Sequence, residues 1–176
     1  MTPEEYIQLK AFARQDGALL ALVWIGSFAC YIQGFSSGML GWLAIVLAVV
    51  SPFFVLRRLR HFRDAARSGI VSFGRGYAYS VLVFFYGGLL LAIAQYVYLA
   101  YLDNGYLLDR LMQFASSAEG RQMLQQMGME QEMSQSLEAM GTVRPIDYAL
   151  SILSLNITAG FILSLPIALA VRRKER

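Results

Sequence analysis

The sequence is constrained most by a run of 40 residues, Gly17 to Leu56, that contains no charged side chain. A single helix of that length would measure about 60 Å, roughly twice the hydrocarbon thickness of a bilayer. The run therefore has to fold back on itself. Gly and Ser residues at 34–38 form the most turn-like part of it. We predict two membrane-spanning helices, at about 17–33 and 39–56.

Two further charge-free runs, 76–102 and 148–171, predict two more spans. Each is longer than the roughly 20 apolar residues that cross a bilayer. Charged residues make up only 15% of the chain, against about 25% in soluble domains. We expect an all-α polytopic membrane protein in which residues 1–176 form a single membrane domain with four transmembrane helices.

The basic residues predict the orientation of these helices. Twelve of the 15 Lys and Arg residues lie in the N-terminal segment, in a loop at 57–75 and in the tail after 171. A four-helix arrangement puts these three segments on one side, and Lys and Arg accumulate on the cytoplasmic side. We therefore expect both termini and the 57–75 loop to be cytoplasmic. The turn at 34–38 and the polar segment 103–146 are expected outside.

Two segments outside the spans have helical patterns. Thr2-Pro3-Glu4-Glu5 resembles a capping box, which predicts a short amphipathic helix at the interface that runs into the first span. In the external segment, residues 106–127 have helical composition and Gly128 is a helix stop. A second helix is expected at about 130–140, so the external segment is predicted to be a helical hairpin.

Six of the eight methionines lie in residues 103–146. Thioether sulfur suits Cu(I), so an external Cu(I) or Ag(I) site is one hypothesis. Its ligands would be Met123, Met127, Met129 and Met133. The other interpretation is a flexible methionine face that packs on the membrane or on a partner, and the Gln- and Glu-rich surroundings without His favour it. We therefore expect no metal site and no cofactor.

The counts of Cys and His exclude other classes of site. The single cysteine, Cys30, excludes an internal disulfide and a cysteine-cluster metal site; we expect it to be a small buried residue. The single histidine, His61, excludes a His-rich metal site and is expected to be solvated. No phosphate-binding loop, nucleophile elbow or zinc-protease motif occurs. The sequence predicts no catalytic residues, so we do not expect an enzyme.

The four predicted spans contain no charged side chain. Charges inside the membrane usually mark ion and proton pathways, so the sequence gives no sign of such a pathway. The polar residues of the spans are expected to make interhelical hydrogen bonds. A polar lining for a lipid headgroup or solute is the alternative. These residues are Gln95, Ser151, Ser154, Asn156, Thr158 and Ser164. The small pairs Gly17/Ala21 and Gly160/Ser164 predict close helix contacts, and Pro166 predicts a kink.

The arginine-rich stretch 57–67 predicts contact with anionic lipid headgroups. Docking of an acidic cytoplasmic partner or of a phosphate-bearing lipid is a sharper alternative. Nucleic-acid binding is not expected, because these charges lie at the membrane surface.

Several segments together suggest a family. Phe62-Arg63-Asp64 precedes the stretch 69–77, Gly-Ile-Val-Ser-Phe-Gly-Arg-Gly-Tyr, which leads into a long apolar helix. A Met- and Gln-rich segment with Met127-Gly128-Met129 follows, then a last helix and a basic tail. The chain resembles the bacterial membrane family catalogued as domain of unknown function 4199. The resemblance implies four helices and a bacterial cytoplasmic membrane, but no activity and no site residues.

Three functions are compatible with the sequence. The leading hypothesis is a non-enzymatic accessory or scaffold protein of a bacterial inner membrane, which acts through a membrane protein partner or by self-association. The second is a small carrier for a lipid-linked intermediate or a hydrophobic solute, lined by polar residues of the last helix. The third is binding of Cu(I) or Ag(I) by the external methionines.

Overall fold

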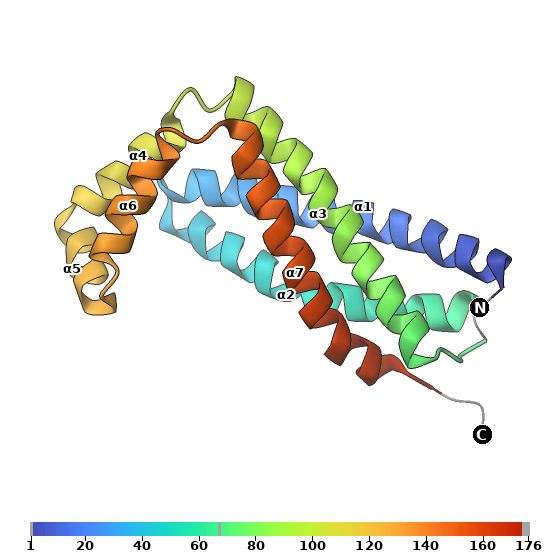
Figure 1. Ribbon diagram of the computed structural model, residues 1–176. Helices are drawn as coiled ribbons and strands as arrows, with labels where there is room; N and C mark the ends of the chain where they lie inside the picture. Colours follow the sequence, from blue (N-terminus) through green and yellow to red (C-terminus); the bar gives the residue numbers. More distant parts are fainter. Residues whose placement is uncertain (1, 67, 174–176) are drawn as a thin grey trace. The chain divides into compact units, whose positions relative to one another are not determined.

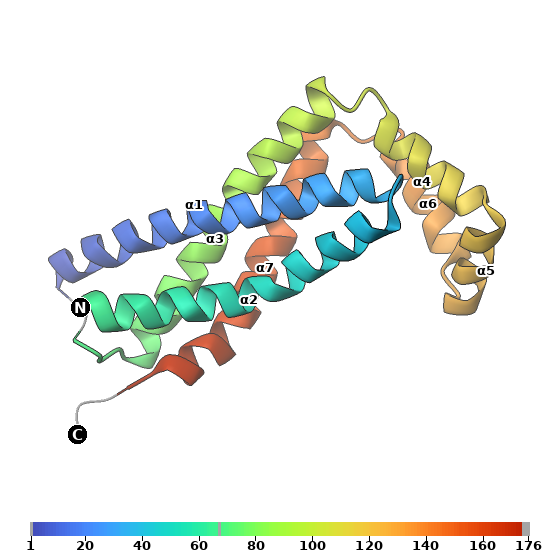
Figure 2. The ribbon, with the colours of Figure 1, turned by 180° about the vertical axis from the view of Figure 1, so that it is seen from behind.

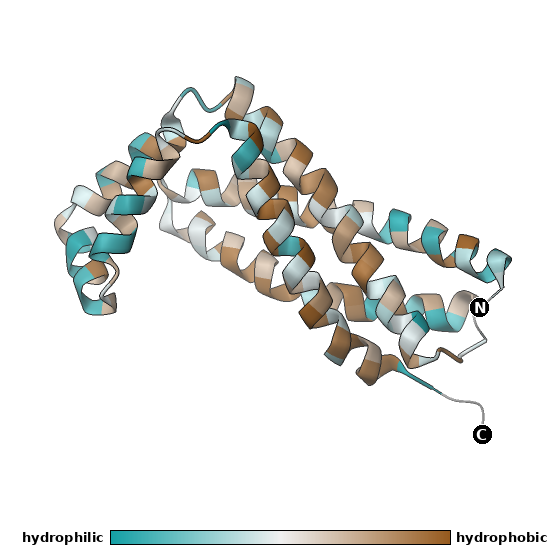
Figure 3. Cartoon of the chain, viewed as in Figure 1, coloured by the Kyte–Doolittle hydropathy of each residue, from teal (hydrophilic) through white to brown (hydrophobic). Residues whose placement is uncertain are grey.

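The computed structural model describes residues 2–66 and 68–173, which contain seven helices (Figure 1). Four of them are long and apolar enough to cross a membrane: α1 (Pro3–Gly34), α2 (Gly38–Ala66), α3 (Phe73–Tyr101) and α7 (Pro145–Val171). The other three are α4 (Tyr106–Ser116), α5 (Ala118–Met127) and α6 (Glu130–Met140). The all-α prediction with four spans is confirmed, and Figure 3 shows apolar residues along the four long helices.

The chain divides into two compact units. Unit 1 comprises residues 1–94 and 151–176, and therefore holds α1, α2 and most of α3 and α7. Unit 2 comprises residues 95–150, with α4, α5 and α6 and the adjoining turns of α3 and α7.

Helix α1 includes the N-terminal helix that was predicted to run into the first span. It begins after Thr2 with the expected capping box, in which the Glu5 amide donates to Thr2 Oγ1 (3.2 Å) and the Thr2 amide to Glu5 Oε2 (2.9 Å). It then continues without a break to Gly34. The apolar residues Leu9 and Ala13 of this first part are fully buried, so it packs on the other helices of unit 1.

The predicted basic loop at 57–75 is mostly helical. Helix α2 continues to Ala66 and α3 begins at Phe73, so only a short connection remains between them. Apolar side chains explain the extension: Val55, Leu59 and Phe62 continue the helical spacing of the span, and each is at most 1% exposed. Burial of this inward face stabilises helix beyond the end of the charge-free run.

Residues 103–146 form three helices rather than the predicted hairpin of two. The expected helix at 106–127 is broken at Ser117, whose hydroxyl accepts a hydrogen bond from the Gly120 amide (3.0 Å) and caps α5. The predicted stop at Gly128 is confirmed, because this glycine ends α5 with a φ of 67°. The helix predicted at 130–140 is present as α6.

In unit 1, helices that follow one another along the chain run antiparallel. Helices α1 and α2 are joined by a hydrogen bond of 2.8 Å from Ser27 Oγ to the Ala44 carbonyl and one of 2.6 Å from Trp24 Nε1 to Ser51 Oγ. Helices α1 and α2 therefore run in opposite directions, as Figures 1 and 2 also show. The hairpin is closed by a close approach of Gly34 to Gly41, where a Cβ on Gly34 would lie 2.8 Å from the other Cα.

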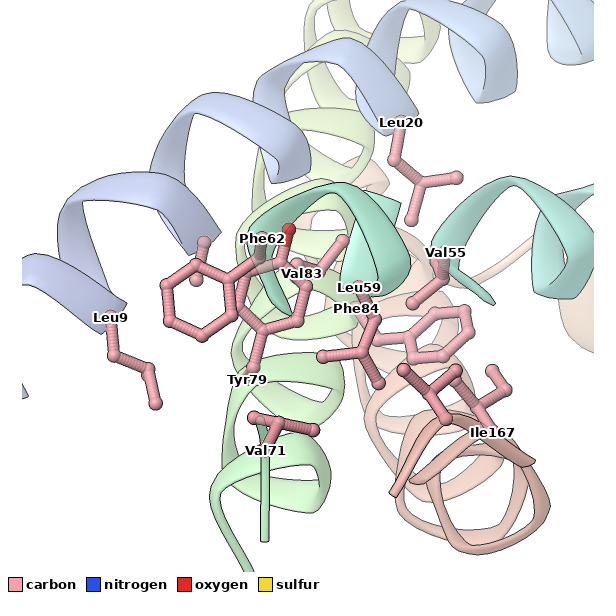
Figure 4. Packing of buried hydrophobic residues seen from close by; sticks show 12 residues of the cluster. Leu9, Leu20, Val55, Leu59, Phe62, Val71, Tyr79, Val83, Phe84 and Ile167 are labelled. Atoms are coloured by element: carbon pink, nitrogen blue, oxygen red, sulfur yellow. The ribbon is translucent and has the colours of Figure 1, made fainter. Parts of the chain in front are cut away.

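The apolar core of unit 1 takes side chains from all four long helices (Figure 4). Phe62 of α2 lies at its centre, since its ring stacks on Tyr79 of α3 at 4.8 Å between centroids and meets Phe12 of α1 edge-on at 5.3 Å. The buried members include Leu9, Leu20, Val55, Leu59, Val71, Val83, Phe84, Ile167 and Val171.

Three parts of the chain that are distant in sequence meet at one end of unit 1. Arg75, at the start of α3, forms an ion pair of 2.7 Å with Glu5 in the first turn of α1. The backbone amide of Arg173, just after α7, donates to the Val71 carbonyl at 3.0 Å. The start of α1 and the end of α7 therefore lie at the same end of the unit, as an even number of crossings requires.

Candidate functional site

A buried polar cluster joins three of the long helices. The Asp16 carboxylate of α1 is fully buried, and its Oδ1 accepts a hydrogen bond of 2.6 Å from Arg58 Nε of α2. Its Oδ2 accepts a hydrogen bond from the hydroxyl of Tyr79 on α3. The guanidinium remains partly exposed, since 26% of the Arg58 side chain is accessible. Both carboxylate oxygens thus have a donor, which a buried ionised group needs.

The local sequence explains why Asp16 points inward. Leu9, Ala13, Asp16 and Leu20 recur at helical spacing, and all four are at most 1% exposed. Asp16 is therefore the charged residue of an otherwise apolar helix face. Arg58 lies beside the buried Leu59, and its long side chain can reach Asp16 while the end of the guanidinium stays accessible.

The helices extend beyond the charge-free spans predicted from the sequence, and the extensions carry charged residues. Asp16 and Arg58 lie one and two residues outside the first charge-free run, but they are inside α1 and α2. The helical spacing of Asp16 with the apolar residues around it was the signal that could have identified it. An ionisable residue within a spanning helix is a candidate functional residue, and here its partners are known.

The hydrogen bonds and the ion pair of this cluster hold α1, α2 and α3 together. Removing one partner of a buried pair leaves the other charge uncompensated, at a typical cost of about 3–5 kcal/mol. A second tie lies at the same end of the unit, where the Arg63 guanidinium donates to the Val171 carbonyl at 3.4 Å and is also paired with Asp64 at 2.7 Å.

Glycines bring α3 into close contact with both neighbours. A Cβ on Gly17 of α1 would lie 2.6 Å from Tyr86 Cβ, and one on Gly160 of α7 would lie 2.6 Å from Phe84 Cβ. Gly88 meets Asn156 in the same way, with a separation of 3.3 Å. The close contacts predicted for Gly17 and Gly160 are confirmed.

The predicted polar residues of α7 do not form one lining. Asn156 lies against Gly88, and Ser164 is fully buried, so these two face the interior of unit 1. Ser151, Ser154 and Thr158 lie on an exposed face instead, where the Thr158 hydroxyl donates to the Ser154 carbonyl at 2.9 Å. A single polar path along this helix is therefore absent from the described part of the chain.

The remaining candidate residues are dispersed. Gln95, in unit 2, is 6% exposed, and its side-chain oxygen has no hydrogen-bond donor among the described residues. His61 is exposed as predicted, and Cys30 is half-buried rather than buried. Pro166 lies within α7. No group of three His, Cys, Asp or Glu residues that could hold a metal occurs in residues 2–66 and 68–173.

The methionines of unit 2 lie in different surroundings. Met112 and Met133 line a groove of about 350 Å³ that α4, α5 and α6 enclose. Met123, Met127 and Met129 do not line that groove, and they are 51%, 55% and 40% exposed. The four ligands proposed for Cu(I) therefore do not all lie in this groove, and three of them form part of the outer surface.

Unit 2 has a second, smaller pocket of about 180 Å³, lined mainly by apolar side chains. Asp103 is its one charged lining residue and is 8% exposed. Its carboxylate accepts a hydrogen bond of 3.1 Å from the Leu107 amide in the first turn of α4. Since a helix N-terminus favours a negative charge, Asp103 is well placed to stabilise the start of α4.

Comparison with known proteins places the chain in a family. No curated protein and no solved structure matches it. A family model covers nearly its whole length, including the Asp16, Arg58 and Tyr79 cluster and all of unit 2, and agrees with the resemblance seen in the sequence. The chain belongs to the family described as "Protein of unknown function (DUF4199)", whose model matches residues 15–173.

Proposed function

We propose that this chain is a non-enzymatic accessory subunit of a bacterial inner membrane that binds a partner protein through unit 2. The observation that carries the proposal is the apolar surface of α4, α5 and α6. Large apolar side chains of these helices stay accessible, and none of the 11 residues of α6 is buried. The exposed members are Met112 and Phe114 of α4, Met123 and Met127 of α5, and Met129 just before α6.

A flexible methionine surface suits a protein partner. Unbranched thioether side chains adapt to irregular apolar surfaces, which is why methionine is frequent at promiscuous binding sites. Large apolar side chains gathered on one small unit are also typical of interaction surfaces. Unit 1 supplies a membrane anchor whose helices are tied together by Asp16, Arg58 and Tyr79.

The charge of unit 2 favours a different protein over a second copy of this chain. Residues 95–150 contain seven acidic and three basic residues, so their formal net charge is −4. Two such surfaces would repel each other, whereas Lys and Arg residues around an apolar patch would complement this one. We therefore expect a partner whose apolar surface has a basic rim.

The experiment is site-specific photo-crosslinking in the native membrane. A photoreactive amino acid replaces Met127 on the proposed surface or, as a matched control, the exposed polar Ser136 of α6. We expect one protein to crosslink at position 127 and not at 136, and to be lost from the variant Met123→Gln/Met129→Gln. Crosslinks to lipid alone, or to a second copy of the chain, would contradict the proposal.

The proposed orientation follows from the arrangement of unit 1. The start of α1, the α2–α3 connection and the end of α7 share one end of the unit and carry most of its basic residues. The positive-inside tendency favours the cytoplasm for this end. Unit 2 would then face the periplasm.

Carriage of a hydrophobic solute is a second candidate. It is favoured by Gln95, whose buried side-chain oxygen lacks a donor among the described residues. The variant Gln95→Leu/Asn156→Leu would abolish carriage and leave partner binding intact. Cu(I) binding is the third candidate. Tight Cu(I) binding by the purified chain that is lost in Met123→Leu/Met127→Leu would support it. A purified chain that does not bind Cu(I) tightly would dismiss it.

A further inference from the structure

Arginines on one turn of α2 have different surroundings. Arg58 points toward α1 and pairs with Asp16. Arg57 and Arg60, on either side of it in sequence, are exposed and form no hydrogen bond or ion pair with another described residue. The guanidinium groups of these two arginines are therefore accessible to a ligand from outside the chain.

The helix face that carries Arg57 and Arg60 is apolar in the turns before Arg57. Residues at helical spacing before them are among the most exposed apolar side chains of the chain. They are Trp42 (71% exposed), Val46 (52%), Val49 (61%) and Phe53 (68%). This stripe from 42 to 53 rises about 17 Å along the helix, and such a face suits contact with lipid chains. A change from apolar side chains to arginines, as from Phe53 to Arg57, is typical of a helix that leaves the hydrocarbon for the headgroups.

The one acidic residue on this face does not neutralise the two arginines. Asp64 lies one turn after Arg60, but its two carboxylate oxygens are taken by the Arg63 guanidinium at 2.7 and 3.1 Å. Arg57 and Arg60 lie at i and i+3, so they are neighbours on the helix surface. Two adjacent guanidinium groups without an acidic partner match a phosphate, which they can bind through several charge-assisted hydrogen bonds.

We propose that Arg57 and Arg60 form a binding site for the headgroup of an anionic phospholipid on the outward face of α2. The acyl chains lie along the stripe from Trp42 to Phe53, and the phosphate lies between the two guanidinium groups. Arg58, which is engaged by Asp16, takes no part. The site is independent of the partner surface proposed for unit 2.

The test uses the full chain reconstituted in phosphatidylcholine vesicles with spin-labelled phosphatidylglycerol or spin-labelled phosphatidylcholine. The wild type is expected to restrain the anionic label several-fold more strongly than the zwitterionic one. In Arg57→Gln/Arg60→Gln this preference should fall by about threefold or more, since each basic residue near the surface contributes a factor of about five. Arg57→Lys/Arg60→Lys keeps the charge and should retain most of it.

The matched control is Arg121→Gln/Arg144→Gln, which removes the same charge from unit 2. It is expected to leave the preference unchanged. An equal loss in both double variants would show an effect of net charge only and would overturn the site, as would a wild type without any preference. Because neither arginine has a partner in the described chain, the thermal midpoint of Arg57→Gln/Arg60→Gln should equal that of the wild type.

Discussion

The carboxylate of Asp16 on α1 accepts a hydrogen bond of 2.6 Å from Arg58 Nε on α2, and Asp16 is completely buried. The two residues are 42 positions apart and join α1 to α2 at a distance from the turn between them. Tyr79 adds α3 to the same contact. A membrane helix pair joined in this way has a defined register, because sliding by one turn would leave a buried charge without a partner.

The first prediction concerns this pair. Asp16→Asn should lower the free energy of unfolding by about 2–4 kcal/mol, because it leaves Arg58 without its counter-charge and Tyr79 without a strong acceptor. The matched acid-to-amide control is Asp64→Asn, whose side chain is 57% exposed in its pair with Arg63 and is expected to contribute little to stability. Unfolding by dodecyl sulfate in mixed micelles measures both. Equal effects of the two variants would contradict a structural tie at Asp16.

The charge-free runs were sufficient to predict the four spans, because a bilayer demands long apolar helices whatever their neighbours are. They misplaced the helix ends. Whether α2 stops at Leu56 or continues depends on what covers Leu59 and Phe62, and this is a matter of tertiary packing. The pairing of Asp16 with Arg58 was missed for the same reason. In the sequence each is a charged residue just outside a charge-free run, as is usual at the end of a span, and only the fold brings the two together.

In unit 2 the sequence predicted where a helix ends at a glycine, but it did not predict the break inside the expected helix at 106–127. Gly128 ends α5 with a positive φ, which glycine adopts at little cost. The break at Ser117 was missed because 106–127 has uniform helical composition, whereas a serine can cap a new helix in any such stretch. The methionine ligands of the copper hypothesis were taken from a sequence cluster, and that cluster is divided between a groove and an outer surface.

The second prediction concerns Gly17. Gly17→Ala should destabilise unit 1 by about 1–3 kcal/mol, because its Cβ would lie 2.6 Å from Tyr86 Cβ and 3.0 Å from the Val83 carbonyl. Gly26→Ala in the same helix is the control, since its Cβ would meet nothing within 4 Å. There alanine should stabilise by up to about 1 kcal/mol through its higher helix propensity. Thermal midpoints in detergent compare the two, and a Gly17→Ala protein as stable as Gly26→Ala would refute close α1–α3 contact.

The third prediction concerns the start of α5. Ser117→Ala removes the hydroxyl that caps the Gly120 amide, and this should weaken α5 by about 1 kcal/mol. Hydrogen exchange of the amides at 119–124 should become about fivefold faster, because this energy corresponds to a factor of about five in the opening equilibrium. Ser136→Ala, in α6, is the control and should leave these amides unchanged. Unaltered exchange in Ser117→Ala would show that the cap does not determine where α5 begins.

The last prediction concerns orientation. In a Cys30→Ser background, Ser72→Cys reports on the α2–α3 connection and Ser134→Cys on α6, and both positions are exposed. With a maleimide that does not cross membranes, we expect spheroplasts to label Ser134→Cys at once and Ser72→Cys only after permeabilisation. The reason is that the Ser72 end of unit 1 carries the unpaired arginines of α2, and such charges remain on the cytoplasmic side. The opposite labelling pattern would reverse the orientation and place the acidic methionine surface of unit 2 in the cytoplasm, so that its partner would have to be sought there.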